Sequence, residues 1–128
     1  MQIKDLNEPI EARQSELDKS SFVGVTLREA RFEDAALQSV RFDYVNMSDA
    51  RFSRMNLSRS VFDDGLLPGV RFTNVNMSGA WFDGVNLAGA AIDNASLAGV
   101  SLRNCNLAGL RVDGVLVSDA LAAYRKSV

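Results

Sequence analysis

Apolar side chains recur at every fifth position from Phe22 to Val117. Two residues before most of them stands a smaller side chain, usually Ala or Val. A period of five matches neither the 3.6-residue period of an α-helix nor the two-residue alternation of a simple strand. A short period that continues over most of a chain is typical of a solenoid, in which each unit buries its apolar face only against its neighbours. The pattern therefore predicts one elongated domain of stacked units.

The repeating unit is clearest at residues 85–89, 95–99 and 105–109, which read VNLAG, ASLAG and CNLAG. This resembles the pentapeptide-repeat family, whose unit is a small apolar residue, Asp or Asn, Leu or Phe, and two variable residues. The resemblance covers residues 20–119. It implies an all-β fold, a right-handed quadrilateral parallel β-helix (a solenoid) of about five coils, with about 20 residues per coil. It also implies that the central residue and the small residue two positions earlier point inward, and it carries no catalytic motif.

Side chains 20 residues apart sort by size, which supports that coil length. Two opposite columns begin with aromatic rings, and the other two are aliphatic. The predicted core includes Phe22, Phe42, Phe62 and Phe82 in one column, Phe32, Phe52 and Phe72 in the opposite column, and Leu87, Leu97 and Leu107 in the aliphatic columns. Stacked rings should gain about 0.5–1.5 kcal/mol per pair beyond burial. At a strand spacing of about 4.8 Å, five coils predict a rod of roughly 24 Å.

Some positions depart from the repeat. Small polar or missing side chains, or oversized apolar ones, stand at inward positions: Ser20, Ser60, Gly65, Met55 and Leu110. The least regular stretch is 63–69, for which two interpretations stay open: a tolerated local distortion, or a bulge or recognition loop. Pro68 has no amide hydrogen and is expected at a corner. Cys105 occupies an inward position and is expected to be a buried, inert thiol.

Residues 1–19 break the period and are interpreted as an N-terminal cap over the open end of the stack. Asn7 and Pro9 are typical of a helix start, so a short helix is expected there. Two alternatives stay open. Residues 15–19 could form a degenerate first repeat, because Leu17 is in phase with the series, or the segment could be an arm that binds a partner.

Residues 120–128 are expected to form a short C-terminal helix that covers the last coil. Ser118 or Asp119 would cap it, and Leu121 and Tyr124 would give it an apolar edge. The C-terminal end dimerises in some members of the family, so the resemblance also implies a homodimer as one alternative.

Outward positions sort by charge once they are arranged in columns. One aromatic wall carries an arginine ladder, Arg31, Arg51, Arg71 and Arg111, and the opposite wall an acidic one, Asp43, Asp63 and Asp83. Like charges in register cost stability unless they are neutralised. Two interpretations stay open: solvated faces with local Arg–Asp pairs, or an elongated recognition surface. Trp81 is either an interface anchor or a cover for a coil edge.

The other two walls carry recurring asparagines among small residues. The set is Asn46, Asn56, Asn76, Asn86 and Asn106. We expect a structural role, with side-chain amides that hydrogen-bond up and down each column.

Composition narrows the function. The chain of 128 residues has a formal charge of −2, which argues against nucleic-acid binding through bulk positive charge. It has no histidine and one cysteine, which removes the commonest general base, an internal disulfide and a cysteine zinc site. No apolar h-region is seen at the N-terminus and no run approaches the roughly 20 residues that span a bilayer. A cytoplasmic protein without membrane association is the expectation.

The leading hypothesis is a non-enzymatic protein-interaction or scaffold rod with no cofactor and no metal, whose partner is another protein. The resemblance implies one alternative, a DNA-mimic-like modulator or protector of DNA gyrase or a related topoisomerase. Against it stand the near-neutral charge and the short acidic column. A second alternative is polyanion binding through the arginine ladder, although direct binding of nucleic acid is not expected.

Overall fold

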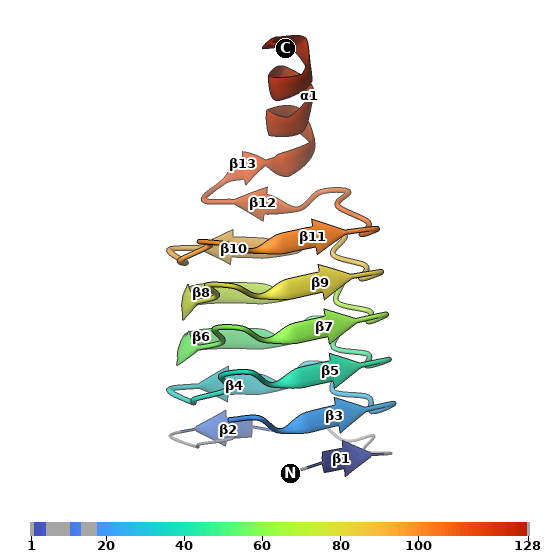
Figure 1. Ribbon diagram of the computed structural model, residues 1–128, viewed down its shortest axis with the longest axis vertical. Coiled ribbons are helices and arrows are strands. Elements are labelled where there is room, and N and C mark those ends of the chain that lie inside the picture. The colour runs from blue at the N-terminus through green and yellow to red at the C-terminus, as the bar shows by residue number, and fades with distance from the viewer. Residues whose placement is uncertain (1, 5–10, 14–17, 128) are drawn as a thin grey trace.

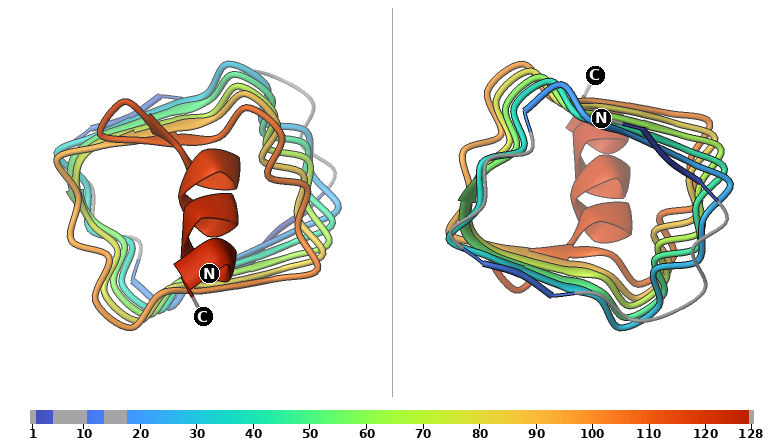
Figure 2. Two further views of the ribbon diagram at one scale, coloured as in Figure 1. Left: turned by 90° about the horizontal axis from the view of Figure 1, so that it is seen from above. Right: turned by 90° about the horizontal axis from the view of Figure 1, so that it is seen from below.

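Short strands stack along one axis into a right-handed, four-sided rod (Figures 1 and 2). The computed structural model describes residues 2–4, 11–13 and 18–127 of the chain. The strands form two sheets on opposite walls of the rod, one of six strands and one of seven. This confirms the predicted right-handed quadrilateral parallel β-helix.

The first sheet contains every second strand, in the order β1-β3-β5-β7-β9-β11. These strands are β1 (Gln2–Lys4), β3 (Ser21–Val23), β5 (Arg41–Asp43), β7 (Val61–Asp63), β9 (Trp81–Asp83) and β11 (Ser101–Arg103). The second sheet has the order β13-β12-β10-β8-β6-β4-β2. Its strands are β2 (Glu11–Arg13), β4 (Arg31–Glu33), β6 (Arg51–Asn56), β8 (Arg71–Asn76), β10 (Ala91–Asp93), β12 (Arg111–Val112) and β13 (Val115–Leu116).

The register of these strands confirms the coil length. Phe22 pairs with Phe42, and Phe32 with Phe52, so residues 20 apart lie one above the other. All pairs are parallel except β12 with β13, which is antiparallel. Each outward position of one coil therefore lies directly above the same position of the previous coil.

The core is built from two columns of phenylalanine that meet in the middle of the rod. Within a column, neighbouring rings stack at centroid distances of 4.6 to 4.9 Å. Between columns they meet edge to face at 6.3 to 6.5 Å. All seven phenylalanines are buried: Phe22, Phe32, Phe42, Phe52, Phe62, Phe72 and Phe82. The predicted columns are thus confirmed, and the opposed columns also contact each other, because Ala and Val at the small inward positions leave room for the rings.

The corners of the coil require backbone in the left-handed region. Glu29 and Asp49 have φ of 60°, and Gly69 has φ of 71°, each at the third position of a β-turn. In that turn the amide of the fourth residue donates to the carbonyl of the first, as from Val70 to Leu67 at 3.2 Å. A positive φ at this position defines a type II turn, which favours Gly or Asn there and Pro just before. Pro68-Gly69 is the best match to this requirement in the chain.

The stretch 63–69 is therefore a regular part of the coil. Leu66 bridges to Asn46 below and Asn86 above, and the amide of Gly69 donates to the carbonyl of Ala88 at 2.9 Å. Neither a distortion nor a protruding loop is present there. Pro68 lies at a corner, as predicted.

The asparagines satisfy local backbone groups. Asn46 Oδ1 accepts the amide of Ser48 at 3.1 Å, and Asn86 Oδ1 that of Ala88 at 3.0 Å. Asn56, Asn76 and Asn106 accept the amide two residues ahead in the same way. Their structural role is confirmed, but the expected hydrogen bonds between asparagine side chains along a column are not among the bonds of the described residues.

Leu66 and Pro68 stand where other coils have the asparagine and the amide that it accepts, and together they remove both the acceptor and the donor of that hydrogen bond. Leu66 stands where the other coils have Asn46 and Asn86, so it offers no side-chain acceptor. The residue two positions ahead is Pro68, which has no amide hydrogen to satisfy. Both halves of the local hydrogen bond are therefore missing together, and no unpaired donor is left.

The N-terminal segment adds strands instead of the expected helix. β1 pairs with β3 and β2 with β4, both parallel, so both sheets continue below the first regular coil. The prediction of a helix is wrong at Glu11–Arg13. Gln2 pairs with Ser21, a separation of 19 residues, whereas Glu11 pairs with Arg31, a separation of 20. This shortened coil puts β1 out of phase with the period of five. Residues 5–10 and 14–17, which include Asn7, Pro9 and Leu17, lie outside the described residues.

The C-terminal end of the core is open. Regular coils stop at Val112, the chain reverses into β13, and the helix α1 (Val117–Ser127) follows (Figure 1). Val117 thus leaves the coil in which the period placed it, and its amide donates to the carbonyl of Leu110 at 3.0 Å. The helix is confirmed and starts earlier than predicted, but the expectation that it buries the last coil is wrong, because Leu102 in that coil stays 38% exposed. None of its residues is buried. No helix among the described residues is long and apolar enough to cross a membrane.

Inward side chains lose their cover in the last coil. Leu97 and Leu107 are only partly buried, and 38% of Leu102 is exposed. An apolar cavity of about 200 Å³ lies there, lined by residues that include Phe82, Leu102 and Leu110. Cys105, expected to be buried, is also only partly buried, and its Sγ lies 3.2 Å from the carbonyl of Arg103.

We predict that replacing Phe52 by Ala lowers the free energy of unfolding by about 3–5 kcal/mol, because Phe52 contacts four other rings and leaves a cavity at the centre of both columns. Chemical denaturation monitored by circular dichroism measures this. Leu66→Ala is the control, and because Leu66 is 49% exposed it should cost less than about 1 kcal/mol. A loss below about 1 kcal/mol for Phe52→Ala would contradict the ring columns.

Candidate interaction surfaces

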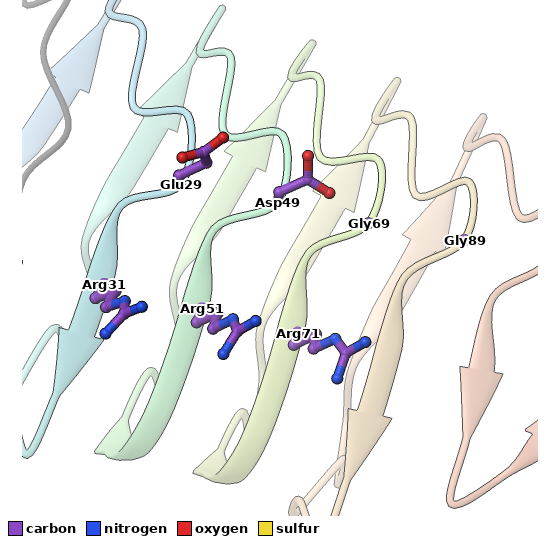
Figure 3. A pocket seen from close by; sticks show the side chains of 7 residues that line it. All are labelled: Glu29, Arg31, Asp49, Arg51, Gly69, Arg71 and Gly89. Atoms are coloured by element: carbon purple, nitrogen blue, oxygen red, sulfur yellow. The ribbon is translucent and has the colours of Figure 1, made fainter.

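An arginine row lies along the wall of the second sheet. Arg31, Arg51 and Arg71 are the first residues of β4, β6 and β8 and pair in direct register. All three are exposed, and Figure 3 shows their side chains as parallel neighbours that extend from successive strands. The spacing of the row is that of the coils, about 4.8 Å.

A second row faces the arginines across a groove. It consists of the third turn residues of successive coils, Glu29, Asp49, Gly69 and Gly89. The two rows line a groove of about 410 Å³ that runs parallel to the rod axis (Figure 3). We call it the arginine groove, lined by Glu29, Arg31, Asp49, Arg51, Gly69, Arg71 and Gly89.

The two ends of the arginine groove differ in charge. Carboxylates stand opposite the arginines at Glu29 and Asp49, and only glycines stand opposite them at Gly69 and Gly89 (Figure 3). Asp49 leans over Gly69: a Cβ built on Gly69 would collide with Asp49 Oδ1. The amides of Gly69 and Gly89 already donate to the carbonyls of the next coil, at 2.9 and 2.8 Å. A ligand in this groove would therefore meet guanidinium groups as its donors.

The three groove arginines differ from Arg41, Arg54 and Arg59, which have side-chain partners. Arg41 and Arg54 form ion pairs, and Arg59 donates to Ser39 and Gln38. Among the described residues, Arg31, Arg51 and Arg71 have no side-chain hydrogen bond and no carboxylate oxygen within 4.0 Å. Three like charges are thus held in register without a direct counterion, which is unfavourable.

Arg111 belongs to the same column but not to the groove. Ala91 separates it from Arg71 in the ladder, and Arg111 Nη1 donates to the carbonyl of Gly114 at 2.9 Å. The predicted ladder of four arginines is thus a contiguous row of three, and the fourth holds the turn that reverses the chain before β13.

The acidic ladder lies on the opposite wall, and an arginine partly neutralises it. Asp43, Asp63 and Asp83 are in register at the ends of β5, β7 and β9. Arg41 Nε lies 2.9 Å from Asp43 Oδ2, and Arg41 Nη2 lies 3.4 Å from Asp63 Oδ2. Asp83 accepts a hydrogen bond of 3.2 Å from Asn104. The contacts on this wall thus fit the interpretation as a solvated face with local Arg–Asp pairs.

Asp63 is the member of that ladder whose ionised form is disfavoured in the folded protein. Its pKa is raised above the ordinary 3.8, first by loss of solvent and then by the charges of Asp64 and Asp43, while Arg41 acts in the opposite direction. Because the folded protein binds this proton more tightly than the unfolded chain, the contribution to stability is complete below pH 3.8 and is lost as the pH rises through the raised pKa. The ionised carboxylate of Asp63 is therefore unfavourable for folding at neutral pH.

Trp81 is partly exposed, at 39%, on the wall of the acidic ladder. The guanidinium carbon of Arg103 lies 5.6 Å from the centroid of its ring, within the range of a cation–π contact. Both uses suggested for Trp81 stay open, because the ring contacts Arg103 of the next coil and is also partly exposed to solvent.

Several residues of these surfaces do not stand out in the period of five. Glu29 and Asp49 begin a column that continues with glycine, and Arg41 lies in a column of mixed residue types, so no ladder was visible there. The available signal for the groove was the row two positions before the arginines. For metals, the described residues contain no group of three or more Asp, Glu or Cys side chains placed to hold an ion.

Comparisons with known proteins agree with the architecture. The family profile described as Pentapeptide repeats matches residues 37–74, 50–87, 71–109 and 82–119, in 8 copies. A search of curated proteins finds no match.

Solved structures that are similar to this chain include HetL, a pentapeptide repeat protein involved in heterocyst differentiation regulation in the cyanobacterium Nostoc sp. strain PCC 7120. It is 12% identical, the alignment covers 88% of this chain and 92% of HetL, and the TM-score is 0.41. AT2G44920, from the Arabidopsis thaliana thylakoid lumen, is 23% identical over 90% of this chain and 77% of its own, with a TM-score of 0.33. The plasmid-mediated fluoroquinolone resistance protein QnrB1 is 12% identical over 100% and 98%, with a TM-score of 0.30.

We predict that Asp63→Asn raises the free energy of unfolding at neutral pH relative to the wild type, and that the gain disappears below pH 3.8, where the wild-type carboxyl is also protonated. Denaturation curves at both pH values measure this. In the matched variant Arg41→Gln, the pKa of Asp63 should rise further, which a carbon NMR titration of the carboxyl follows. A lower pKa of Asp63 in Arg41→Gln would show that the charge of Arg41 does not act on it.

Proposed function

The chain belongs to the pentapeptide-repeat family, and we propose that it is a non-enzymatic interaction rod whose arginine groove binds a protein partner. The observation that carries this proposal is the row of Arg31, Arg51 and Arg71, exposed, in register and without a direct counterion among the described residues. Such a row costs stability in the isolated chain, and an acidic partner would remove that cost.

The mixed charge of the groove lining favours a protein partner over a polyanion. A polyanion would meet Glu29 and Asp49 on one side of the arginines, and the chain as a whole carries a charge of −2. Both features repel a dense row of phosphates. A protein segment, by contrast, presents acidic and neutral or basic groups side by side and so suits a groove with mixed charge.

The DNA-mimic alternative is less well supported. A DNA-mimicking surface needs a dense, unpaired row of carboxylates, as the phosphates of DNA present. Here Asp43 and Asp63 share Arg41, and the next position after Asp83 in that column is Arg103. We therefore favour binding of a protein partner in the arginine groove, on the opposite wall, over modulation of a topoisomerase.

We expect Arg51→Glu/Arg71→Glu to abolish capture of the protein partner from the source cytosol, because both charges at the centre of the groove are reversed. Cross-linking with mass spectrometry, from purified rod added to cytosol, identifies the partner and maps its cross-links. Arg54→Glu/Arg59→Glu is the matched control, with the same change in net charge outside the groove. Capture that survives reversal of Arg51 and Arg71 but is lost with Trp81→Ala would place the interface on the opposite wall and refute the groove as the binding surface.

We also propose that the open C-terminal end pairs with a second copy of the chain. The last coil leaves Leu97, Leu102 and Leu107 partly exposed beside a helix that buries none of its residues. The helix carries Asp119 in its first turn and Arg125 and Lys126 in its last. Two copies of α1 packed antiparallel about a twofold axis would bring each Asp119 near the basic turn of the other and would cover both open cores.

Analytical ultracentrifugation tests this pairing. The wild type should have twice the chain mass of 13.9 kDa, and Leu121→Arg should have the mass of one chain, because it places a charge on the shared apolar surface. Leu66→Arg is the control for an exposed leucine elsewhere and should remain paired. A wild-type protein that stays at 13.9 kDa up to millimolar concentration would rule the pairing out.

A further inference from the structure

We infer that the ligand of the arginine groove is an acidic α-helical segment that lies along the rod axis. This rests on the proposed function and adds to it the conformation of the partner. In such a segment, carboxylates at positions i, i+3 and i+7 would each meet one of Arg31, Arg51 and Arg71.

The spacing of the row selects a helix. Neighbouring coils are separated by 4.6 to 4.9 Å, as the stacked rings show, so the row spans about 9.6 Å from the first arginine to the third. In an α-helix, residues i and i+7 are about 10.5 Å apart along the axis. In an extended strand, three side chains on one face span about 13 Å. A helix thus stays in register with all three arginines to within about 1 Å, whereas a strand is displaced by more than 3 Å at the third.

The strand alternative fails for a second reason. A peptide that binds as an added strand relies on main-chain hydrogen bonds to a free sheet edge. The groove lies on the face of a wall, and the amides of its turn row already donate to the next coil: Asp49 to Pro68, Gly69 to Ala88 and Gly89 to Ala108. Side-chain recognition by guanidinium groups remains, and it requires only that the carboxylates lie at the right intervals.

The opposite row of the groove determines which side chains can flank the carboxylates of the helix. Glu29 and Asp49 face the first two arginines, and glycines face the third (Figure 3). A helix with Lys or Arg beside its first two carboxylates would meet both rows. Beside the third carboxylate, Asp49 Oδ1 occupies the space over Gly69, and the open space beside Gly89 leaves room for a bulky flank.

Binding of stapled peptides, measured by fluorescence anisotropy, tests the inference. The first probe is an Ala-rich stapled helix with Glu at i, i+3 and i+7. The second is a stapled helix with the same three Glu distributed around its circumference. The third is an unstapled peptide with Glu at alternate positions and Pro residues that prevent helix formation. We expect the first probe to bind at least about tenfold more tightly than either of the others, because only it places a charge-assisted contact on each arginine.

Matched variants tie this preference to the groove. Arg51→Gln/Arg71→Gln should weaken binding of the first probe about tenfold or more, and Arg54→Gln/Arg59→Gln by less than about threefold. Equal affinity of the first and second probes, or no measurable binding of the first at millimolar peptide, overturns the inference.

Two further outcomes separate this inference from the proposed function. If the extended probe binds most tightly and still depends on Arg51 and Arg71, the groove binds a protein segment but not a helix, so the inference fails and the proposed function stands. If an oligothymidylate competes with the first probe and binds more tightly through the same arginines, the ligand is a nucleic acid and both fail.

Discussion

Ring stacking inside the rod is the interaction on which everything outside it depends. Each inner phenylalanine, such as Phe52, is stacked on rings above and below and touches rings of the opposite column edge to face. A shift of one residue in any coil would turn its inward side chains outward and break contacts in both columns at once. The register of 20 residues is therefore strongly favoured, and outward side chains inherit that register whether or not it suits them. This is how three arginines come to lie one above another without a direct counterion among the described residues.

The two charged walls show two responses to enforced register. On the first sheet, Arg41 reaches Asp43 and Asp63 and reduces the repulsion between them. The pKa of Asp63 is still raised, first by loss of solvent and then by the neighbouring carboxylates. On the second sheet the arginines have carboxylates across a groove instead of in contact. The first arrangement satisfies charges within the chain. The second leaves guanidinium groups free for another molecule, and for this reason it is the better candidate for a binding surface.

The sequence predicts best what the period of 20 determines. The phenylalanine columns, the arginine row and the acidic ladder could all be read from residue identity, because strand register places like positions together. The shortened first coil could not, since Gln2 pairs with Ser21 at a separation of 19 and so falls out of phase. Arg41 bridging two aspartates depends on a rotamer, and the open end depends on where the chain leaves the coil after Val112. Neither of these is encoded in the period.

The groove itself was hidden because its residues also serve the backbone. Gly69 and Gly89 stand at turn positions with φ near 70°, where glycine needs no functional explanation. The same turn position accepts Glu29 and Asp49 in the preceding coils, so a side chain is tolerated there at some cost. The carboxylate of Asp49, from the preceding coil, fills the space that a Cβ on Gly69 would need. Glycine at this position therefore suits the turn and also allows that carboxylate to lean along the axis. A row that changes from acid to glycine thus satisfies the corner of every coil and, at the same time, leaves one end of the groove open and cationic.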